Sequence, residues 1–332
     1  MRAPEFWGRR DGGAASIMLA PLGALYALAS RARFALARPE RVSVPVLCVG
    51  NLVAGGAGKT PVALSLGARL KTRGLNVHYL SRGYGGATAG PTRVDLARHG
   101  CRDVGDEALL LAQVAPTWVA ADRVAGARAA IAAGAHAIVM DDGFQNPLLA
   151  KDMSLVVVDG GYGFGNGSVL PAGPLREPLV RGLARARAVV IVGDDRSGAR
   201  DRIAAAGFTT LPVLGVRIVP GPEAQVLAGR KVIAFAGIGR PAKFFATVRD
   251  VGAEVVTAHA FPDHHVFSAG ELRRLRSEAE GAGAVLVTTA KDAVRLPESE
   301  RGAIQVLTIT LAWDDEAALD AVLKPMTTPS RC

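Results

Sequence analysis

The sequence is poor in cysteine, in aromatic residues and in long runs of one charge. Its 332 residues include three cysteines, Cys48, Cys101 and Cys332, which share no metal-ligand spacing and cannot all pair. We therefore expect a reducing compartment. Aromatic residues make up only 5%, which argues against stacking platforms for single-stranded nucleic acid. No basic run is long enough for a nucleic-acid arm, so we predict no nucleic-acid partner.

The composition is that of an ordinary globular protein. Hydrophobic residues make up 49% and charged residues 21%, which excludes a wholly disordered chain, and the length allows two domains. Lysine and arginine number 39 against 30 acidic residues, giving a net charge of +9. This charge favours an anionic partner, either a nucleotide, a phospholipid surface or a phosphorylated substrate, without choosing among them.

Residues 12–30 carry no charge and would span about 28 Å as a helix. Pro21 and Gly23 lie inside this stretch and weaken a transmembrane interpretation. Large apolar residues share one side of the helical wheel, and small residues such as Ser16 and Ala20 share the other. The large residues are Met18, Leu19, Leu22, Leu25 and Tyr26. Three interpretations stay open: an amphipathic helix in a membrane interface, a secretory signal peptide, or a core helix.

A glycine-rich segment follows a buried-strand pattern at residues 44–49 and precedes an amphipathic helix at 62–70. A strand, a glycine-rich turn, Gly-Lys-Thr and a helix form the context of a P-loop, whose backbone N–H groups surround phosphate oxygens. Lys59 reaches the β- and γ-phosphates, and the Thr60 hydroxyl ligates Mg²⁺. The predicted nucleotide-binding residues are Val53, Ala54, Gly55, Gly56, Ala57, Gly58, Lys59 and Thr60.

One position departs from the standard P-loop pattern, because Val53 stands where glycine is expected. The alternative reading is a glycine-rich turn with an incidental Gly-Lys-Thr. We favour phosphate binding because the strand-to-helix context is present. A triphosphate is available in the cytosol, so the motif also argues against export of the chain.

A second nucleotide element is expected where the apolar run 137–140 ends in Asp141 and Asp142. A carboxylate at that strand end can hold Mg²⁺, and we include Thr60 and Gln145 in the same predicted metal site. The alternative is a pair of exposed aspartates that begin a turn.

Other polar positions are weaker signals when taken alone. Arg82 and Tyr84 follow a short strand at 77–80, and Asp106 precedes a helix, where it is either a cap or a general base. Arg123 is a phosphate ligand or one of a surface pair, and a proline-rich loop presents Arg176.

The fold class indicated is α/β, with a mostly parallel P-loop sheet and a smaller C-terminal α/β unit. We predict a membrane-associating helix region over 1–40, a P-loop kinase domain over 41–225 and the smaller domain over 226–332. The smaller unit should contain strands at 232–236, 254–258 and 284–288 and helices at 241–250 and 269–280. His264 follows one of these strands, and no third ligand lies near it, so zinc is not expected. Lys291 and Asp292 are expected to form an ion pair within this domain.

Taken together, the motifs resemble the tetraacyldisaccharide 4′-kinase family, the lipid A 4′-kinases of Gram-negative bacteria. The resemblance covers the chain to about residue 296, and the family's shifted P-loop also lacks the early glycine. The matching segments are 50–61, 81–86, 104–107, 141–145, 170–178, 261–265 and 288–296.

The resemblance implies transfer of the ATP γ-phosphate to the 4′-hydroxyl of tetraacyldisaccharide 1-phosphate, giving lipid IVA. It implies ATP and Mg²⁺, a membrane lipid substrate, and attachment to the cytosolic face of the inner membrane by the N-terminal helix. Asp106 matches the catalytic carboxylate, His264 its partner from the other domain, and Lys59 a catalytic phosphate ligand. The matching ligands for sugar or phosphate are Arg82, Tyr84, Glu107, Arg123 and Arg176.

Three positions depart from the family pattern: Ala108, Asn146 and Ala290 stand where proline, histidine and glutamate are frequent. Two alternatives to this function stay open. One is a P-loop kinase of a soluble small molecule, and the other is a P-loop switch or partitioning ATPase. No obligate protein partner is evident from the sequence.

Overall fold

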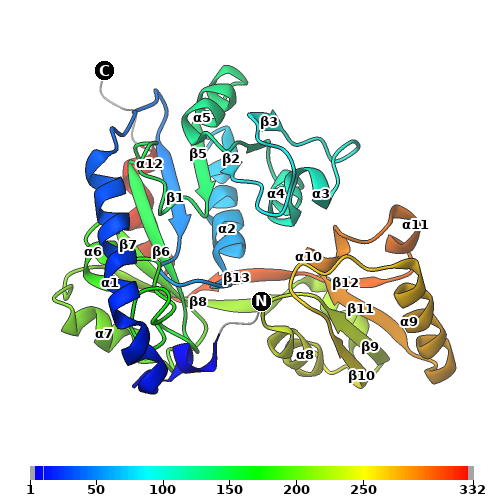
Figure 1. The fold of residues 1–332 in the computed structure, drawn as a ribbon. Helices are drawn as coiled ribbons and strands as arrows, with labels where there is room; N and C mark the ends of the chain where they lie inside the picture. Colours follow the sequence, from blue (N-terminus) through cyan, green and yellow to red (C-terminus); the bar gives the residue numbers. More distant parts are fainter. Residues whose placement is uncertain (1–3, 10, 328–332) are drawn as a thin grey trace.

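Two β-sheets with helices on their faces make up the molecule (Figure 1). The computed structural model describes residues 4–9 and 11–327, so Cys332 lies outside the described residues. The helices and strands alternate along the chain, as expected for the α/β class.

The larger sheet has nine strands, and the seven in its middle are parallel to one another. Only the edge strands β13 and β3 run antiparallel to their neighbours. In spatial order the strands are β13 (Ile309–Trp313), β8 (Val213–Pro220), β7 (Ala188–Val192), β6 (Met153–Asp159), β1 (Val46–Gly50), β5 (Ala137–Asp141), β2 (Val77–Ser81), β4 (Thr117–Val119) and β3 (Thr92–Arg93). The central strands are apolar runs buried on both faces, the pattern of parallel sheets covered by helices.

Helices cover this sheet and bring polar side chains to the carboxyl ends of its strands. Helix α2 (Lys59–Thr72) packs Val62, Leu66 and Leu70 into the core. The other elements of this unit are η1 (Glu5–Gly8), α1 (Gly13–Leu36), α3 (Cys101–Val104), α4 (Asp106–Ala112), α5 (Arg123–Ala132), α6 (Leu179–Leu183), α7 (Ala199–Ala205) and α12 (Glu316–Thr327). Because parallel strands end at one edge of the sheet, the loops after β1, β2 and β5 lie close together.

The smaller sheet has four parallel strands, in the order β10 (Glu254–Ala260), β9 (Lys231–Ala236), β11 (Val285–Thr289) and β12 (Gln305–Leu307). It is accompanied by η2 (Pro222–Leu227), α8 (Pro241–Asp250), α9 (Ala269–Ala282), α10 (Ala290–Ala293) and α11 (Glu298–Arg301). The expected strands and helices of this unit are present within a few residues of their expected bounds.

The end of the chain returns to the larger sheet. Strand β13 pairs with β8, with Ile309 opposite Pro220, and α12 contributes Leu319 and Leu323 to the core beneath α2. The prediction that all of 226–332 belongs to the smaller unit is therefore wrong for this last segment. The buried apolar side chains of β13 and α12 belong to the core of the larger sheet, and no local pattern marks which sheet these elements join. The division of the rest of the chain into domains remains a proposal.

Helix α1 lies against the larger unit by its small residues. The Ser16 hydroxyl donates to the carbonyl oxygen of Ala172 at 2.8 Å, and Gly23 is buried beside Val169. Large apolar side chains face solvent instead, among them Met18, which is 79% exposed. The helix is long and apolar enough to cross a membrane, yet only 11% of its most apolar window is buried. A core helix is thus excluded.

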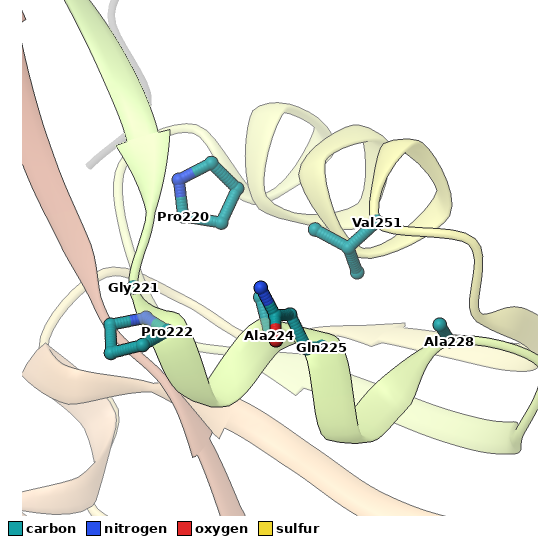
Figure 2. Close-up of a pocket in the computed structure, with 7 residues that line it drawn as sticks. All are labelled: Pro220, Gly221, Pro222, Ala224, Gln225, Ala228 and Val251. Carbon is teal, nitrogen blue, oxygen red and sulfur yellow. The ribbon is translucent and has the colours of Figure 1, made fainter.

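A pocket of about 370 Å³ lies where the chain passes from β8 to η2 (Figure 2). Pro220, Pro222 and Gln225 line it on one side, and Val251, after α8, closes the other. Its lining carries no titratable side chain, so we assign it no chemistry.

Candidate active site

The glycine-rich loop between β1 and α2 has the conformation that a phosphate-binding loop requires. Gly55 and Gly58 have φ angles of 115° and 85°, which side chains other than glycine rarely adopt. The Asn51 amide donates to the carbonyl oxygens of Val53 and Gly55, at 2.8 and 3.2 Å, and so holds the loop. Helix α2 begins at Lys59, so its positive N-terminal end faces the loop.

Val53 replaces glycine without strain, because its backbone is extended. It forms an antiparallel bridge with Leu175, and the N–H of neighbouring Ala54 donates to the carbonyl oxygen of Pro174 at 2.7 Å. The N–H of Arg176 donates to Leu52 at 2.7 Å. The proline-rich loop therefore supports the start of the P-loop and brings Arg176 to it.

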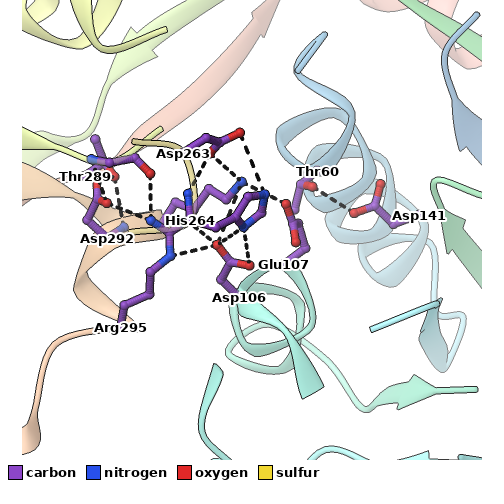
Figure 3. Close-up of polar contacts among 11 residues, drawn as sticks. Thr60, Asp106, Glu107, Asp141, Asp263, His264, Thr289, Asp292 and Arg295 are labelled. Carbon is purple, nitrogen blue, oxygen red and sulfur yellow. Dashed lines mark hydrogen bonds and ion pairs between the residues drawn. The ribbon is translucent and has the colours of Figure 1, made fainter. Parts of the chain in front are cut away.

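A carboxylate suited to Mg²⁺ lies at the end of β5. Thr60 donates its hydroxyl to Asp141 Oδ2 at 2.8 Å (Figure 3). The other oxygen, Oδ1, is buried without a hydrogen-bond partner in the described part of the chain. Burial raises the pKa of Asp141 to about 7, although Lys59 acts in the opposite direction. An unpartnered buried carboxylate beside a threonine hydroxyl fits a divalent cation, so these residues fit the group implied by the sequence.

Asp142 belongs to a second polar group beside the same strand end. Its Oδ1 accepts from Arg176 at 3.0 Å and lies 3.8 Å from Lys59 Nζ, and its backbone has a φ of 53°. Burial opposes ionisation, but Lys59 and Arg176 outweigh it and lower the pKa of Asp142. Gln145 accepts from Arg176 at 3.3 Å through its amide oxygen, so the structure places it with Arg176 rather than leaving it open for a metal.

Asp106 and His264 meet, although 158 positions separate them. Asp106 begins α4 in the larger unit, and His264 follows β10 in the smaller one. The His264 Nδ1 atom lies 3.1 Å from Oδ1 and 3.0 Å from Oδ2 of Asp106 (Figure 3). His264 has a φ of 60°, and its ring centroid is 5.7 Å from that of Tyr84.

The charges around this pair favour its ionised form. Burial opposes ionisation of Asp106, but the hydrogen bond to His264 and the charges of Lys291 and Arg295 outweigh burial and lower its pKa. The hydrogen bond to Asp106 in turn raises the pKa of His264, against its partial burial.

Sequence reasoning missed the site role of Lys291 and Arg295. Lys291 Nζ lies 2.9 Å from Glu107 and 3.8 Å from Asp106, so it pairs across the two units rather than with Asp292. Arg295 bonds Asp106 and also pairs with Asp292 at 2.9 Å. The spacing of three residues between Asp292 and Arg295 was the only local signal available.

A family model for tetraacyldisaccharide-1-P 4′-kinases matches residues 15–327. The chain belongs to this family. It is 56% identical over 323 residues to the tetraacyldisaccharide 4′-kinase of Gluconacetobacter diazotrophicus, covering 97% of each chain. It is 55% identical over 319 residues to that of Paramagnetospirillum magneticum, covering 96% of this chain and 97% of the relative.

A crystal structure of LpxK from Aquifex aeolicus in complex with ATP superposes with a TM-score of 0.74. It is 26% identical and covers 94% of this chain and 99% of its own. The family, the α/β fold class and the kinase activity predicted from the sequence are thus confirmed, and ATP with Mg²⁺ is the cofactor pair of such a kinase. The soluble-substrate kinase and the switch ATPase are not favoured. The roles of individual residues remain predictions.

Arg123 and Arg82 differ in their surroundings. Arg123 is buried, donates to the carbonyl oxygens of Ala120 and Ala121, and has an Nε without a hydrogen-bond partner among the described residues. Burial, together with the charge of Arg82, lowers the pKa of Arg123 to about 10. Arg82 itself is exposed. Two neighbouring guanidinium groups, one with a buried free donor, suit an anionic ligand.

Asp106, Glu107 and His264 also bring ligand atoms within 4.8 Å of one another, as a cation site would. Lys291 and Arg295 already neutralise both carboxylates, however. A metal ion there would meet two positive side chains, so this cluster is a poor second cation site, and the predicted Mg²⁺ site is the one at the end of β5.

Asn146, which departs from the family pattern, forms hydrogen bonds within its own loop. Its side-chain oxygen accepts from the backbone N–H groups of Leu148 and Leu149, each at 3.0 Å, and Lys151 donates to its carbonyl oxygen. Asn146 therefore shapes the loop that follows Asp141 and Asp142.

Proposed function

We propose that this chain transfers the γ-phosphate of ATP to the 4′-hydroxyl of tetraacyldisaccharide 1-phosphate and so forms lipid IVA. The observation that carries the site assignment is the contact of Asp106 with His264 on the P-loop side of the molecule. Such a pair serves a reaction in which a hydroxyl must lose a proton, which nucleotide binding alone does not require.

Asp106 acts as the general base. As the sugar oxygen forms its bond to the γ-phosphorus, the bond from that phosphorus to the β,γ-bridging oxygen breaks and ADP leaves. The hydroxyl proton passes to Asp106, and His264 orients the carboxylate and receives or shares that proton. Because Asp106 is ionised at neutral pH, it is ready to accept the proton when substrate arrives.

The P-loop side of the site handles phosphate charge. Lys59 and the N–H groups at the start of α2 offset charge on the β- and γ-phosphates. Mg²⁺, held by Thr60 and Asp141, supplies further charge stabilisation when bound. Asp142 holds Lys59 and Arg176 in place between turnovers.

We assign the remaining predicted residues to the lipid's sugar and phosphate. Arg123, with its unpartnered Nε, and nearby Arg82 are donors for a phosphate. Tyr84 is exposed beside His264 and offers an apolar face to a sugar ring. Glu107, held by Lys291, accepts from sugar hydroxyls, and Arg176, held by Asp142, binds phosphate or a sugar hydroxyl.

Helix α1 attaches the chain to the cytosolic face of the inner membrane. Its outward apolar side chains enter the lipid interface, and its arginines contact lipid phosphates. Arg33, on α1, donates to the carbonyl oxygen of Gln145 at 3.0 Å, so this helix lies close to the predicted metal site. Attachment there allows an acylated sugar to reach the site without leaving the membrane.

The test is incubation of the purified chain with ATP, Mg²⁺ and the disaccharide 1-phosphate lipid, followed by mass spectrometry. We expect one added phosphate at the 4′ position. Asp106→Asn should lower the rate about 100-fold or more, the usual contribution of a general base. Asp250→Asn, at an exposed residue on α8, is the matched control and should keep the rate. Full activity of the Asp106 variant would exclude the assigned base.

A further inference from the structure

Arg295 is fixed within the smaller unit before it reaches across to the larger one. Its side chain is 1% exposed. Its Nη1 atom donates to the carbonyl oxygen of Gly237 at 2.7 Å. The same atom donates to Asp292 at 2.9 Å (Figure 3). Asp292 is held in turn by the hydroxyl of Thr289 at 2.6 Å. The guanidinium plane is therefore set by groups of its own unit.

The two remaining nitrogen atoms of the Arg295 guanidinium, Nε and Nη2, both donate to one oxygen of Asp106. Nε lies 2.8 Å from Oδ2, and Nη2 donates to the same atom. Oδ1, in contrast, has His264 as its one hydrogen-bond partner among the described residues, at 3.1 Å. The two oxygens of the carboxylate are thus inequivalent, because one is bound by a buried cation and the other is not.

We propose that Arg295 is a positioning residue for the phosphoryl transfer, which orients the carboxylate of Asp106 so that Oδ1 receives the proton of the acceptor hydroxyl. The inference rests on the proposed function, since it needs Asp106 as the base. A carboxylate held at one oxygen by a fork of N–H donors loses little orientation between turnovers. His264 Nδ1 lies within hydrogen-bond distance of both oxygens, so the contacts of Arg295 alone distinguish Oδ1 from Oδ2.

The charges facing Asp106 come from every element packed against it. Glu107 lies beside it on α4, Lys291 approaches from α10, and His264 follows β10 together with Asp263, which is 3.7 Å from Lys291. Arg295 is the most deeply buried cation of the group, and its charge is among those that lower the pKa of Asp106. Removing this charge should raise that pKa.

The experiment compares kcat and KM of Arg295→Gln with those of Arg301→Gln at neutral pH. Arg301 lies in the same unit and, within the described part of the chain, bonds only the carbonyl oxygens of Leu296 and Val294, so its variant is the control. For Arg295→Gln we expect kcat at least about 10-fold lower and the KM for the lipid acceptor changed by less than about twofold, because the base loses its orientation while substrate binding is kept. The affinity for ATP with Mg²⁺, measured by calorimetry, should stay within about twofold.

Arg295→Lys is a second variant that tests the proposal if Arg295→Gln does not fold. It keeps the charge but not the fork, so we expect kcat about fivefold lower or more with an unchanged KM. A wild-type rate in Arg295→Lys, or a loss in Arg295→Gln that lies in KM and not in kcat, would overturn the proposal. Failure of the proposed function looks different, because Asp106→Asn itself would then keep its activity.

Discussion

At the scale of single residues, Asp141 is the one carboxylate in the described chain with a buried oxygen that has no hydrogen-bond partner. It is buried, one oxygen has no partner, and its pKa is raised to about 7 by burial. A protein rarely retains such a group unless a ligand completes it. Without metal, the ionised carboxylate of Asp141 lowers the stability of the fold, because the charge of Lys59 and the hydroxyl of Thr60 do not compensate for its burial.

We predict that Asp141→Asn abolishes transfer but stabilises the metal-free protein above neutral pH. Because the folded pKa lies above that of the unfolded chain, wild-type stability should fall as pH rises from about 4 to about 7 and stay low above. The variant should lack this decline and melt about 3 °C higher at pH 8, in calorimetry with a chelator.

The control for this prediction is Asp250→Asn, which changes an exposed carboxylate on α8. It should follow the wild-type pH dependence. Equal melting temperatures of wild type and Asp141→Asn at pH 8 would show that the carboxylate is satisfied without metal.

The site could be predicted from the sequence where residues occur in a local motif. Lys59, Thr60 and Asp141 follow strand ends, and the resemblance to the family supplied Asp106 and His264. Arg295 could not be found in this way, because its partner is 189 positions distant and only the fold brings them together. An ion pair between residues far apart in the chain produces no periodic pattern in a single sequence, so it cannot be predicted from periodicity.

At the scale of elements, α1 has its packing reversed relative to an ordinary amphipathic helix of a globular protein. Small residues such as Gly23 face the molecule, since a Cβ there would lie 2.9 Å from the carbonyl oxygen of Val169. The large apolar residues face outward. The helical wheel distinguished a face of large apolar residues from a face of small residues, but only the structure shows that the small-residue face packs against the protein.

We predict that Met18→Gln, Leu22→Gln and Leu25→Gln, combined, weaken binding to anionic phospholipid vesicles about 100-fold or more. Each side chain is at least half exposed and loses its transfer free energy into lipid. The melting temperature should change by less than about 2 °C, because these residues contact little of the protein. Vesicle flotation measures the first quantity and calorimetry the second.

The matched control changes three exposed apolar residues away from α1: Leu96→Gln, Val226→Gln and Val256→Gln. This triple variant should bind vesicles as the wild type does. If it loses as much binding as the α1 variant, attachment is spread over the surface and the helix is not the anchor.

Among the elements, the hydrophobic patterns predicted the smaller unit well, since α8 and the strands beside it are regular and short. They did not predict that β13 leaves that unit. A strand of five residues pairs with any free sheet edge of suitable length, and the choice of β8 depends on where the chain emerges.

At the scale of the whole molecule, ion pairs hold the two units together at separate places. One is the group around Asp106. The other is Asp159, at the end of β6, whose oxygens lie 2.8 Å from Arg240 and 2.6 Å from Lys243 near the start of α8. Burial opposes ionisation of Asp159, but Lys243 and Arg240 outweigh it and lower its pKa.

We predict that Asp159→Asn loosens the units without unfolding either. Arg240 and Lys243 are about 36% and 51% exposed, so water solvates them when the pair is lost and the melting temperature should fall by about 2 °C or less. Trypsin should cleave near residue 230 at least about threefold faster in the nucleotide-free protein.

Asp194→Asn serves as the comparison, because its pair with Arg196 is exposed and lies within one unit. Its cleavage rate should match that of the wild type. Unchanged cleavage in Asp159→Asn would mean that the contacts around Asp106 suffice to hold the units together.

The pairing of Pro220 with Ile309 makes the smaller unit an insertion rather than an appendage. The chain leaves and re-enters the larger sheet at adjacent points, so the paired strands β8 and β13 are the two covalent connections of the insert to that sheet. Splicing residue 220 to residue 309 through a short turn would close the gap as an ordinary hairpin. The nucleotide-binding body would then keep Asp106 but lack His264 and Arg295, the two side chains proposed to orient that base.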